Sequence, residues 1–436
     1  MSGAAVVIGT GGIGRALANE LEQRGEHALV LRLGRSTEQR LDYADAPVWQ
    51  AAQQRLLEQL GLWSAVQAVL VPFRCLELLD LATQRQVPFH LADLGSRRAA
   101  APAAAVGWVG QHRPLMTLLL ERLSAHPAIT LELGTAPPPA AAKQPPHDLI
   151  VAADGPHSPS REALGIGAFQ WAYRQNCLTA LVQLRGSADD QAWELLRPEG
   201  PFAVLPLGDG LFQLVWSAPA QRCRQLESLG DSAFLDALAG ALPDQLQPDA
   251  LLDDPRAFPV ALLLARSLHR GQTVLVGESG HRCHPVGGQG LNLCWRDVAT
   301  LHRLARRATA GRLAVHRLPA AYARRRWPDL LLTLLATDLL VRFFSNRSPL
   351  LLPLRMTGDT WLPLSGATPP CWPLSKGLLA SCARHSCQLR NACVPRFPLR
   401  GPLRARTARR PRQLLRTRRL PGLRTRRWNP THQPPL

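Results

Sequence analysis

The residues between Gly277 and Asp297 combine glycines, acids and a proline in an order that could hold a phosphate-bearing cofactor. This segment, GESGHRCHPVGGQGLNLCWRD, follows an apolar run at 273–276 that predicts a buried strand, and the apolar residues 298–301 predict a helix after it. Glycines allow the backbone to approach a ligand closely, and the N–H groups of a helix N-terminus favour anionic phosphate. The pattern predicts a cofactor loop, although any α/β protein can place a glycine-rich turn between a strand and a helix.

A second polar segment occurs earlier in the chain. Residues 148–153 predict a short buried strand, and the sequence DGPHSPSR follows at 154–161. Asp154 and Ser158 suit the N-terminus of the next helix, where free N–H groups need acceptors. The segment can therefore be a capped helix alone, or a second part of the cofactor site.

The N-terminus contains the G-x-G-x-x-G pattern of dinucleotide-binding folds at Gly9, Gly11 and Gly14. An apolar strand is predicted before it, at 4–8, and an amphipathic helix after it, to about Arg24. The glycines permit a tight turn and the close approach of a pyrophosphate. This context predicts a dinucleotide site.

The second strand of this unit, predicted at 27–31, is not followed by the residue that a dinucleotide site requires. An acid that binds ribose is expected, but Arg32 and Arg35 occupy the region. Basic residues suit the 2′-phosphate of NADP, so the unit resembles the start of a short-chain dehydrogenase. Enzymes of that family use a Tyr-x-x-x-Lys pair for proton transfer. No such spacing occurs among the tyrosines and lysines of the chain, which are Tyr43, Tyr173, Tyr322, Lys143 and Lys376.

The positive charge of the chain is concentrated at its C-terminal end. Of the formal net charge of +19, residues 360–436 supply sixteen charges, with fifteen Arg, one Lys and no acid, so the first 359 residues carry only +3. A nucleic-acid-binding domain would need a basic face on its folded part. The composition therefore argues against nucleic acid as a partner of the folded body.

Residues 359–436 are rich in arginine and proline and show no sustained apolar periodicity, which predicts a disordered tail. Three explanations for it are open: a basic arm that binds RNA or anionic lipid, an inert extension, or an out-of-frame translation of GC-rich DNA. The third agrees with a composition in which Arg, Ala and Pro dominate and lysine is nearly absent.

Chain length and cysteine content limit the number of subdomains, the kind of metal site and the cellular compartment that can be expected. The 436 residues are enough for two or three packed subdomains. The nine cysteines include no C-x-x-C pair, so no zinc site is expected, and an odd number without a signal peptide favours a reducing cytoplasm. Cys283 and Cys294 flank the predicted cofactor loop, but small buried cysteines are commoner than redox-active ones.

Both polar segments resemble motifs of the FAD-dependent aromatic-ring hydroxylases. In the second flavin motif of that family, Gly-Asp is followed by His, Pro, Gly-Gln-Gly, Asn and a downstream Asp. Glu278 replaces the usual Asp and still offers a carboxylate to a ribose hydroxyl. Residues 154–161 are similar to the family's Asp-Gly-x-x-Ser-x-x-Arg motif, which lies between the flavin and the pyridine nucleotide. The residues that match the flavin motif are Gly277, His281, Pro285, Gly288, Gln289, Gly290, Asn292 and Asp297.

The resemblance extends over about residues 53–355. Residues 53–63 resemble a helix that ends in Leu-Gly-Leu-Trp. Arg113 corresponds to an arginine near the cofactor, although an ordinary surface arginine at a helix start explains it equally well. Residues 337–346 resemble a C-terminal segment shared by the hydroxylases of ubiquinone biosynthesis. The family has an arginine-led segment between the second strand and the next helix, and residues 41–51 keep little of it. The N-terminal sequence has therefore diverged from the family, been exchanged for another, or been wrongly predicted from the gene.

The expected fold is α/β: an FAD-binding Rossmann-like domain with an inserted antiparallel β-sheet substrate domain, a helical C-terminal segment and the disordered basic tail. A discontinuous FAD-binding domain is expected at 1–66, 94–166 and 266–328. The substrate domain is expected at 67–93 and 167–265, the C-terminal helices at 329–358, and the tail at 359–436.

The resemblance implies a flavin-dependent monooxygenase. In that family NAD(P)H reduces FAD, the reduced flavin captures O2 as a C4a-hydroperoxide, and one oxygen atom is transferred to a phenolic ring. The expected substrate is a small aromatic, lipid-like molecule, specifically a polyprenylated phenol of quinone biosynthesis. Because the cofactor performs the oxygen chemistry, no catalytic residue and no metal ligand is assigned. The expected cofactor-binding residues are Gly9, Gly11, Gly14, Arg113, Asp154, Gly155, Gly277, Glu278, Pro285, Gly288, Gln289, Gly290 and Asn292.

The protein is expected in the cytoplasm, and a lipid-like substrate suggests peripheral contact with the inner membrane face. The apolar run at 330–354 is interrupted by Asp338 and Arg342, so a membrane span is not expected. Two alternatives stay open. One is an NADP-dependent reductase that uses the N-terminal unit, and the other is an inactive flavoprotein homologue whose basic tail binds nucleic acid.

Overall fold

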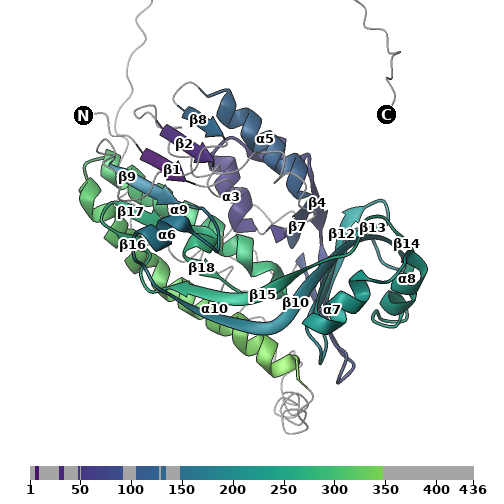
Figure 1. Cartoon of the computed structure of the whole chain (residues 1–436). Helices are drawn as coiled ribbons and strands as arrows, with labels where there is room; N and C mark the ends of the chain where they lie inside the picture. The colour runs from purple at the N-terminus through teal and green to yellow at the C-terminus, as the bar shows by residue number, and fades with distance from the viewer. Residues whose placement is uncertain are drawn as a thin grey trace, which may run out of the picture. The chain divides into compact units, whose positions relative to one another are not determined.

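A six-stranded sheet positions both polar segments (Figure 1). The computed structural model describes residues 5–8, 29–33, 48–49, 51–91, 105–126, 129–133 and 148–346. Neighbouring strands in this sheet are parallel, except for β16 and β17. In spatial order, the strands are β16 (His269–Arg270), β17 (Thr273–Leu275), β9 (Leu149–Ala152), β1 (Ala5–Ile8), β2 (Leu29–Leu33) and β8 (Ile129–Leu133).

Three of the parallel strands end at the same edge of this sheet. Leu275 of β17 and Ile8 of β1 both lie opposite Ala152 of β9, so the chain leaves these strands side by side. Ligands of parallel α/β sheets bind outside the carboxyl ends of the strands. The loop after β9 leads into α6 (Pro159–Ala163), and the loop after β17 contains the short helices η2 (Gly277–Ser279) and η3 (Val286–Gly288).

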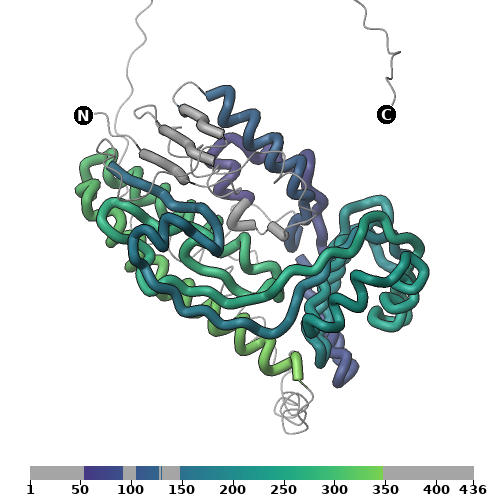
Figure 2. Tube along the Cα trace, viewed as in Figure 1, coloured from purple at the N-terminus to yellow at the C-terminus, as the bar shows by residue number. Residues whose placement is uncertain are grey.

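A second, nine-stranded sheet is antiparallel except for one parallel pair among its described strands, β11 with β5. The long strands β10 and β15 pair along most of their length and are traced side by side in Figure 2. In spatial order, the strands are β18 (His281–Arg282), β15 (Arg256–Ala265), β10 (Ala168–Arg185), β13 (Leu211–Pro219), β12 (Phe202–Gly208), β11 (Gln191–Leu196), β5 (Cys75–Asp80) and β6 (Arg85–His90), and β14 (Gln247–Leu251) pairs with β10.

The two faces of this sheet bury different clusters, because alternate residues of a strand point to opposite faces. One face packs against α7 (Ala220–Glu227) and α8 (Asp231–Ala239), around Phe202 and Trp216, whose stacked rings lie 4.8 Å apart. The other face carries Ala192 and Leu205, which form a small apolar cluster with Phe73 and Val109. Phe73 and Val109 belong to a three-stranded sheet of β3 (Val48–Trp49), β7 (Gly107–Gly110) and β4 (Leu70–Phe73).

The helices supply most of the remaining core. α3 (Ala51–Gln59), α4 (Trp63–Gln67) and α5 (His112–Ser124) share a large cluster with α9 (Gln289–Thr309) and α10 (Leu318–Phe344). Between the last two lies the short helix η4 (Val315–Arg317). Within the ranges described above, no helix combines the length and the apolar character that crossing a bilayer requires.

The α/β fold, the antiparallel sheet and the C-terminal helical segment that the sequence predicts are all confirmed. The C-terminal helix begins earlier than expected, at Leu318 rather than near residue 329, and continues through Pro328. Near its start, α10 contacts β17, because the hydroxyl of Tyr322 donates to the carbonyl oxygen of Leu275 at 3.0 Å. The predicted tail at 359–436 lies outside the described residues.

Candidate cofactor site

The two polar segments of the sequence meet in the structure. Arg161 of α6 is 4% exposed and donates from Nη1 to the carbonyl oxygen of Ser279 at 2.9 Å. Its Nη2 donates to the carbonyl oxygen of Pro156 at 2.9 Å, within its own segment. Ser279 also donates from Oγ to the carbonyl oxygen of Ala152 at 2.7 Å. Residues separated by 118 positions in the chain therefore build one site.

The first loop is shaped by its own side chains. Asp154 accepts hydrogen bonds from Oγ of Ser158 at 2.5 Å and from the backbone N–H of Ser160 at 2.9 Å. Ser158 caps α6, as the sequence predicts, by accepting from the N–H of Arg161 at 3.0 Å. Both carboxylate oxygens of Asp154 are thus engaged inside the loop. Gly155 beside it has a φ of +88°, and a Cβ there would meet no described atom within 4 Å, so a ligand can approach its backbone.

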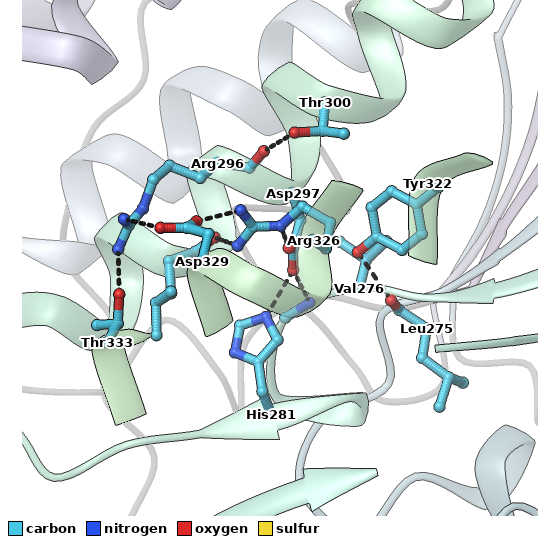
Figure 3. Close-up of polar contacts among 12 residues, drawn as sticks. Leu275, Val276, His281, Arg296, Asp297, Thr300, Tyr322, Arg326, Asp329 and Thr333 are labelled. Carbon is cyan, nitrogen blue, oxygen red and sulfur yellow. Dashed lines mark hydrogen bonds and ion pairs between the residues drawn. The ribbon is translucent and has the colours of Figure 1, made fainter. Parts of the chain in front are cut away.

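A buried ion-pair network holds the second segment (Figure 3). Asp297 of α9 is fully buried, accepts from the backbone N–H of Gly277 at 2.8 Å and lies 2.7 Å from Nε2 of His281. Arg326 of α10 donates from Nε to the other carboxylate oxygen at 2.5 Å, and its Nη1 pairs with Asp329. The network therefore ties the start of the loop to two long helices.

These partners determine the charge of the central carboxylate. Burial by itself would raise the pKa of Asp297, but His281, Arg326 and the N–H of Gly277 lower that pKa to about 2. Burial would lower the pKa of Arg326, but the carboxylates of Asp297 and Asp329 raise it above its usual value. Asp297 is therefore ionised at neutral pH and stabilises the loop rather than donating a proton.

A second set of contacts holds the middle of the loop. His284 is fully buried; its Nδ1 accepts from the N–H of Val286 at 3.2 Å, so its Nε2 carries the proton and donates to Oε1 of Gln175 at 3.2 Å. Burial lowers the pKa of His284 to about 3, which keeps the ring neutral. Tyr173 packs edge-on against this ring, with ring centroids 5.0 Å apart, and donates to Asp338 of α10 at 2.9 Å. These contacts link the loop to β10 and α10.

The loop ends at the N-terminus of α9, which suits an anion. Gly287 and Gly288 have φ values of +66° and +61°, a conformation that favours glycine. No side chain caps α9 and its first turn contains no acid, so its N–H groups can bind phosphate oxygens. Asn292 stabilises the turn by donating from Nδ2 to the carbonyl oxygen of Gly288 at 2.7 Å.

The residues around this helix start fit an FAD molecule. Gln289 is 3% exposed, and its Nε2 donates to the carbonyl oxygen of Gly287 at 3.1 Å. Its Oε1 is buried with no hydrogen-bond partner among the described residues, which leaves an acceptor for a cofactor hydroxyl or N–H group. A Cβ on Gly290 would meet no described atom within 4 Å, so the space beside it is open. Glu278 is exposed and pairs with Arg282 at 3.3 Å.

Most of the predicted cofactor-binding residues lie on the two joined segments. Gly9, Gly11 and Gly14 lie outside the described residues, although β1 before them ends beside β9. Arg113 is exposed in the first turn of α5, and its place near the cofactor stays a prediction. The residues on the joined segments are Asp154, Gly155, Gly277, Glu278, Pro285, Gly288, Gln289, Gly290 and Asn292.

Three residues that shape the loop were missed by the sequence analysis. His284 stands beside Pro285 and was not part of the matched pattern, and Gln175 lies in an ordinary strand. Arg326 is the last of three consecutive arginines, so nothing in the sequence distinguishes it from its neighbours. Asp297 was singled out only through its match to the flavin motif, and the sequence did not indicate that Arg326 is its partner.

The cysteines beside the loop are poor candidates for chemistry. Burial raises the pKa of Cys283 to about 12 and that of Cys294 well above its ordinary value, and a thiol in this state is a weak nucleophile. In the part of the chain that the structure describes, no three side chains of His, Cys, Asp or Glu are grouped as a metal ion would require.

Sequence comparisons with known proteins also indicate an FAD-binding protein. A family model described as FAD binding domain matches residues 146–328. The chain is 30% identical to 3-demethoxyubiquinol 3-hydroxylase of Escherichia coli, over 79% of this chain and 90% of that protein. It is also 30% identical to ubiquinone hydroxylase UbiL of Rhodospirillum rubrum, over 78% of this chain and 81% of that protein.

Solved structures agree on the fold. A probable FAD-dependent monooxygenase, pqsL of Pseudomonas aeruginosa, superposes with a TM-score of 0.65 at 18% identity, over 79% of this chain and 96% of that one. HpxO of Klebsiella pneumoniae, in complex with FAD and uric acid, gives a TM-score of 0.63 at 18% identity, over 81% and 92% of the two chains. The joined loops, the fold and the relatives lead to one conclusion. This chain belongs to the FAD-dependent aromatic-ring hydroxylases of ubiquinone biosynthesis.

Proposed function

We propose that this hydroxylase acts on a polyprenylated phenol of quinone biosynthesis, with NAD(P)H as the electron donor and O2 as the oxygen source. The relatives support the substrate class, since one is named as a hydroxylase of a demethoxyubiquinol and another as a ubiquinone hydroxylase. The structural observation that carries the proposal is the hydrogen bond between Arg161 and Ser279, which joins the loops after β9 and β17.

The described residues would bind and orient FAD, and FAD when bound supplies the oxygen chemistry. The N-terminus of α9 favours negative charge on the cofactor, and Gln289 offers it a hydrogen-bond acceptor. Asp297 and His284 fix the loop at two points, which keeps the reacting groups in a constant geometry.

The substrate would lie against the nine-stranded sheet, in the domain expected at 67–93 and 167–265. On the face that lacks α7 and α8, Ala203, Leu207 and Val215 are only partly buried where they pack against the apolar cluster around Val109. An apolar surface with few polar groups suits an aromatic ring that carries an isoprenoid chain.

Peripheral membrane contact is part of the proposal. α10 exposes Leu331, Leu335 and Leu339, which repeat every four residues and so share one face. Trp171 of β10 is also exposed, and the guanidinium carbon of Arg342 lies 5.1 Å from its ring centroid. Leucine, tryptophan and arginine together suit a lipid interface. Vesicles of anionic phospholipid should therefore sediment the wild-type chain but not a variant with Leu335→Ser and Leu339→Ser, and a wild-type chain that stays in solution contradicts this contact.

The activity test combines the purified FAD-loaded chain with NAD(P)H, O2 and a prenylated phenol. We expect NAD(P)H oxidation that the phenol stimulates, and a product with one additional ring oxygen by mass spectrometry. Oxidation that no prenylated phenol accelerates contradicts the proposal. Tight NADPH binding by a protein without flavin absorption would instead support the reductase that the N-terminal unit suggests.

A further inference from the structure

An open pocket lies between β10 and the C-terminal end of α10, which are neighbouring elements in Figure 1. Tyr173 of β10 donates to Asp338 of α10 at 2.9 Å beside it. The pocket has a volume of about 330 Å³, at the lower end of the roughly 300–1,000 Å³ of small-molecule sites. Its lining includes Trp171, Tyr173, Arg174, Gln175, Arg342 and Ser345.

An irregularity in β10 brings Arg174 to this pocket. The pairing of β10 with β15 shifts register between Ala172 and Asn176, so the strand has a bulge there. Arg174, inside the bulge, has a φ of +59°, a left-handed conformation that is uncommon in residues other than glycine. Because Arg174 is exposed, core packing does not account for this strain. Bulges and strained residues cluster at functional sites, which points to a ligand for Arg174.

The pocket offers hydrogen-bond donors that other side chains do not use. The side chain of Arg174 has no ion pair or hydrogen bond with any described residue. Arg342 donates from Nε to Asp338 at 2.7 Å, and its two terminal nitrogens have no acceptor in the described part of the chain. The hydroxyl of Ser345 likewise has no partner within the described ranges. Since Asp338 balances the charge of Arg342, Arg174 supplies a net positive charge.

These donors are groups that bind a phosphate. A guanidinium presents several N–H groups in one plane and can pair with two phosphate oxygens, and a hydroxyl can donate to a third. One net positive charge matches the single negative charge of a phosphodiester. The pocket is therefore complementary to a phosphodiester in both charge and hydrogen bonding.

Exposed apolar residues beside the pocket indicate which phosphodiester it fits. Leu335 and Leu339 are 66% and 59% exposed, and Arg342 follows Leu339 by three residues, so all three share one face of α10. Phe169 and Trp171, alternate residues on one face of β10, are also exposed. Tryptophan is enriched where lipid headgroups meet water. A free phosphate makes no use of an apolar surface, whereas a membrane lipid contacts it with acyl chains.

We propose that this pocket binds the phosphodiester of an anionic phospholipid. Arg174, Arg342 and Ser345 donate to its oxygen atoms, and the exposed leucines of α10 contact its acyl chains. The inference rests on the membrane contact proposed above and adds a defined lipid site to it.

A lipid in this pocket lies close to the cofactor loop. Tyr173 and Gln175, on either side of Arg174 in the chain, both contact His284 of that loop. The site therefore holds the cofactor loop near the membrane, in which a polyprenylated phenol dissolves.

The test is isothermal titration calorimetry of the FAD-loaded full chain with dihexanoyl phosphatidylglycerol. The lipid is kept below the concentration at which it forms micelles, so the arginines of residues 360–436 meet no charged surface. About one lipid should bind per chain. Arg174→Gln should weaken binding by about fivefold or more. Ser345→Ala, which changes no charge, should weaken it by about two- to tenfold, and both variants should retain wild-type FAD content.

Arg224→Gln is the matched control. Arg224 is exposed on α7, outside the pocket, and its substitution removes the same charge, so lipid affinity should stay unchanged. Glycerol phosphate has the phosphate without acyl chains and should bind the wild type about tenfold more weakly than the lipid, or less tightly still. Equal affinity for the two compounds would overturn the lipid as the occupant.

The outcomes separate the pocket from the membrane contact. Equal lipid affinity in Arg174→Gln and the wild type would overturn the pocket, while sedimentation with vesicles would still support the membrane contact. Wild-type affinity in Ser345→Ala would indicate diffuse charge attraction and would also overturn the pocket. A wild-type chain that neither binds the lipid nor sediments with vesicles would overturn both proposals.

Discussion

The guanidinium of Arg161 donates to the carbonyl oxygen of Ser279 at 2.9 Å, across 118 positions of sequence. The relationship follows from the sheet, because β9 and β17 are parallel neighbours whose ends lie at the same edge. Adjacent strand ends bring two loops near one another, and the buried side chain then fixes the distance between them. One cofactor can therefore contact both loops.

Arg161→Ala should weaken FAD binding and reduce the free energy of unfolding by about 3 kcal/mol, because two buried carbonyl oxygens lose a charged donor. FAD titration and chemical denaturation of one preparation measure both effects. Arg185→Ala is the control. Arg185 is 66% exposed and pairs with Asp249 at the surface, so the expected change is below about 1 kcal/mol. Equal effects of the two substitutions would contradict the importance of the Arg161 contact.

Gly290→Ala should separate folding from cofactor binding. A Cβ at this position in α9 meets no described atom within 4 Å, so stability without FAD should stay constant or rise by up to about 1 kcal/mol. Because FAD is proposed to occupy that space, its dissociation constant should rise by about tenfold or more. Gly240→Ala, at the end of α8, adds a Cβ that makes only ordinary contacts and should leave FAD affinity unchanged. Unaltered FAD affinity in Gly290→Ala would place the cofactor elsewhere.

Asp297→Asn should reduce the free energy of unfolding by about 3–5 kcal/mol, because Arg326 and His281 lose their buried charge partner. The pKa of Asp297 in the folded chain, about 2, lies below its ordinary value of 3.8. Its contribution is therefore complete above about pH 4 and is lost as the pH falls toward 2. Denaturation curves over this range should show the difference between variant and wild type shrinking at the acid end. A difference that is independent of pH would show that the charge of Asp297 is unimportant.

The ionisation of Glu194, a buried residue of β11, should change stability with pH in the direction opposite to that of Asp297. Its pKa is raised from 4.5 to about 7 in the folded chain, so the stability of the wild type should fall as the pH rises through this interval and then level off. A rise of this size corresponds to about 3 kcal/mol. Glu194→Gln should remove the slope and be more stabilising at high pH than at low pH. Denaturant midpoints across the interval measure this, and a slope that persists in the variant would assign the titration to another group.

The parts of the site that depend on neighbours along the chain could be predicted from the sequence. The strand, loop and helix around 273–301 follow from apolar runs and glycine positions, and the Ser158 cap follows from its residue type and place. Family resemblance added the cofactor and the reaction, which local patterns cannot supply.

The remaining features depend on packing between distant elements. Arg326 is one of three consecutive arginines, and only the position of α10 against α9 brings it to Asp297. Glu194 lies in a strand of ordinary composition, and its burial comes from packing beside β12 and β5 in the nine-stranded sheet. The contact of α10 with β17 through Tyr322 also joins residues that are 47 positions apart. Pairwise contacts of this kind leave no periodic pattern in a single sequence.

The visible absorption spectrum of the purified chain after addition of FAD and removal of free cofactor tests the central claim most directly. If the loops after β9 and β17 bind one FAD, the protein should retain flavin absorption with about one FAD per chain, and NAD(P)H should bleach it in the absence of O2. A folded chain that retains no flavin absorption would contradict the account.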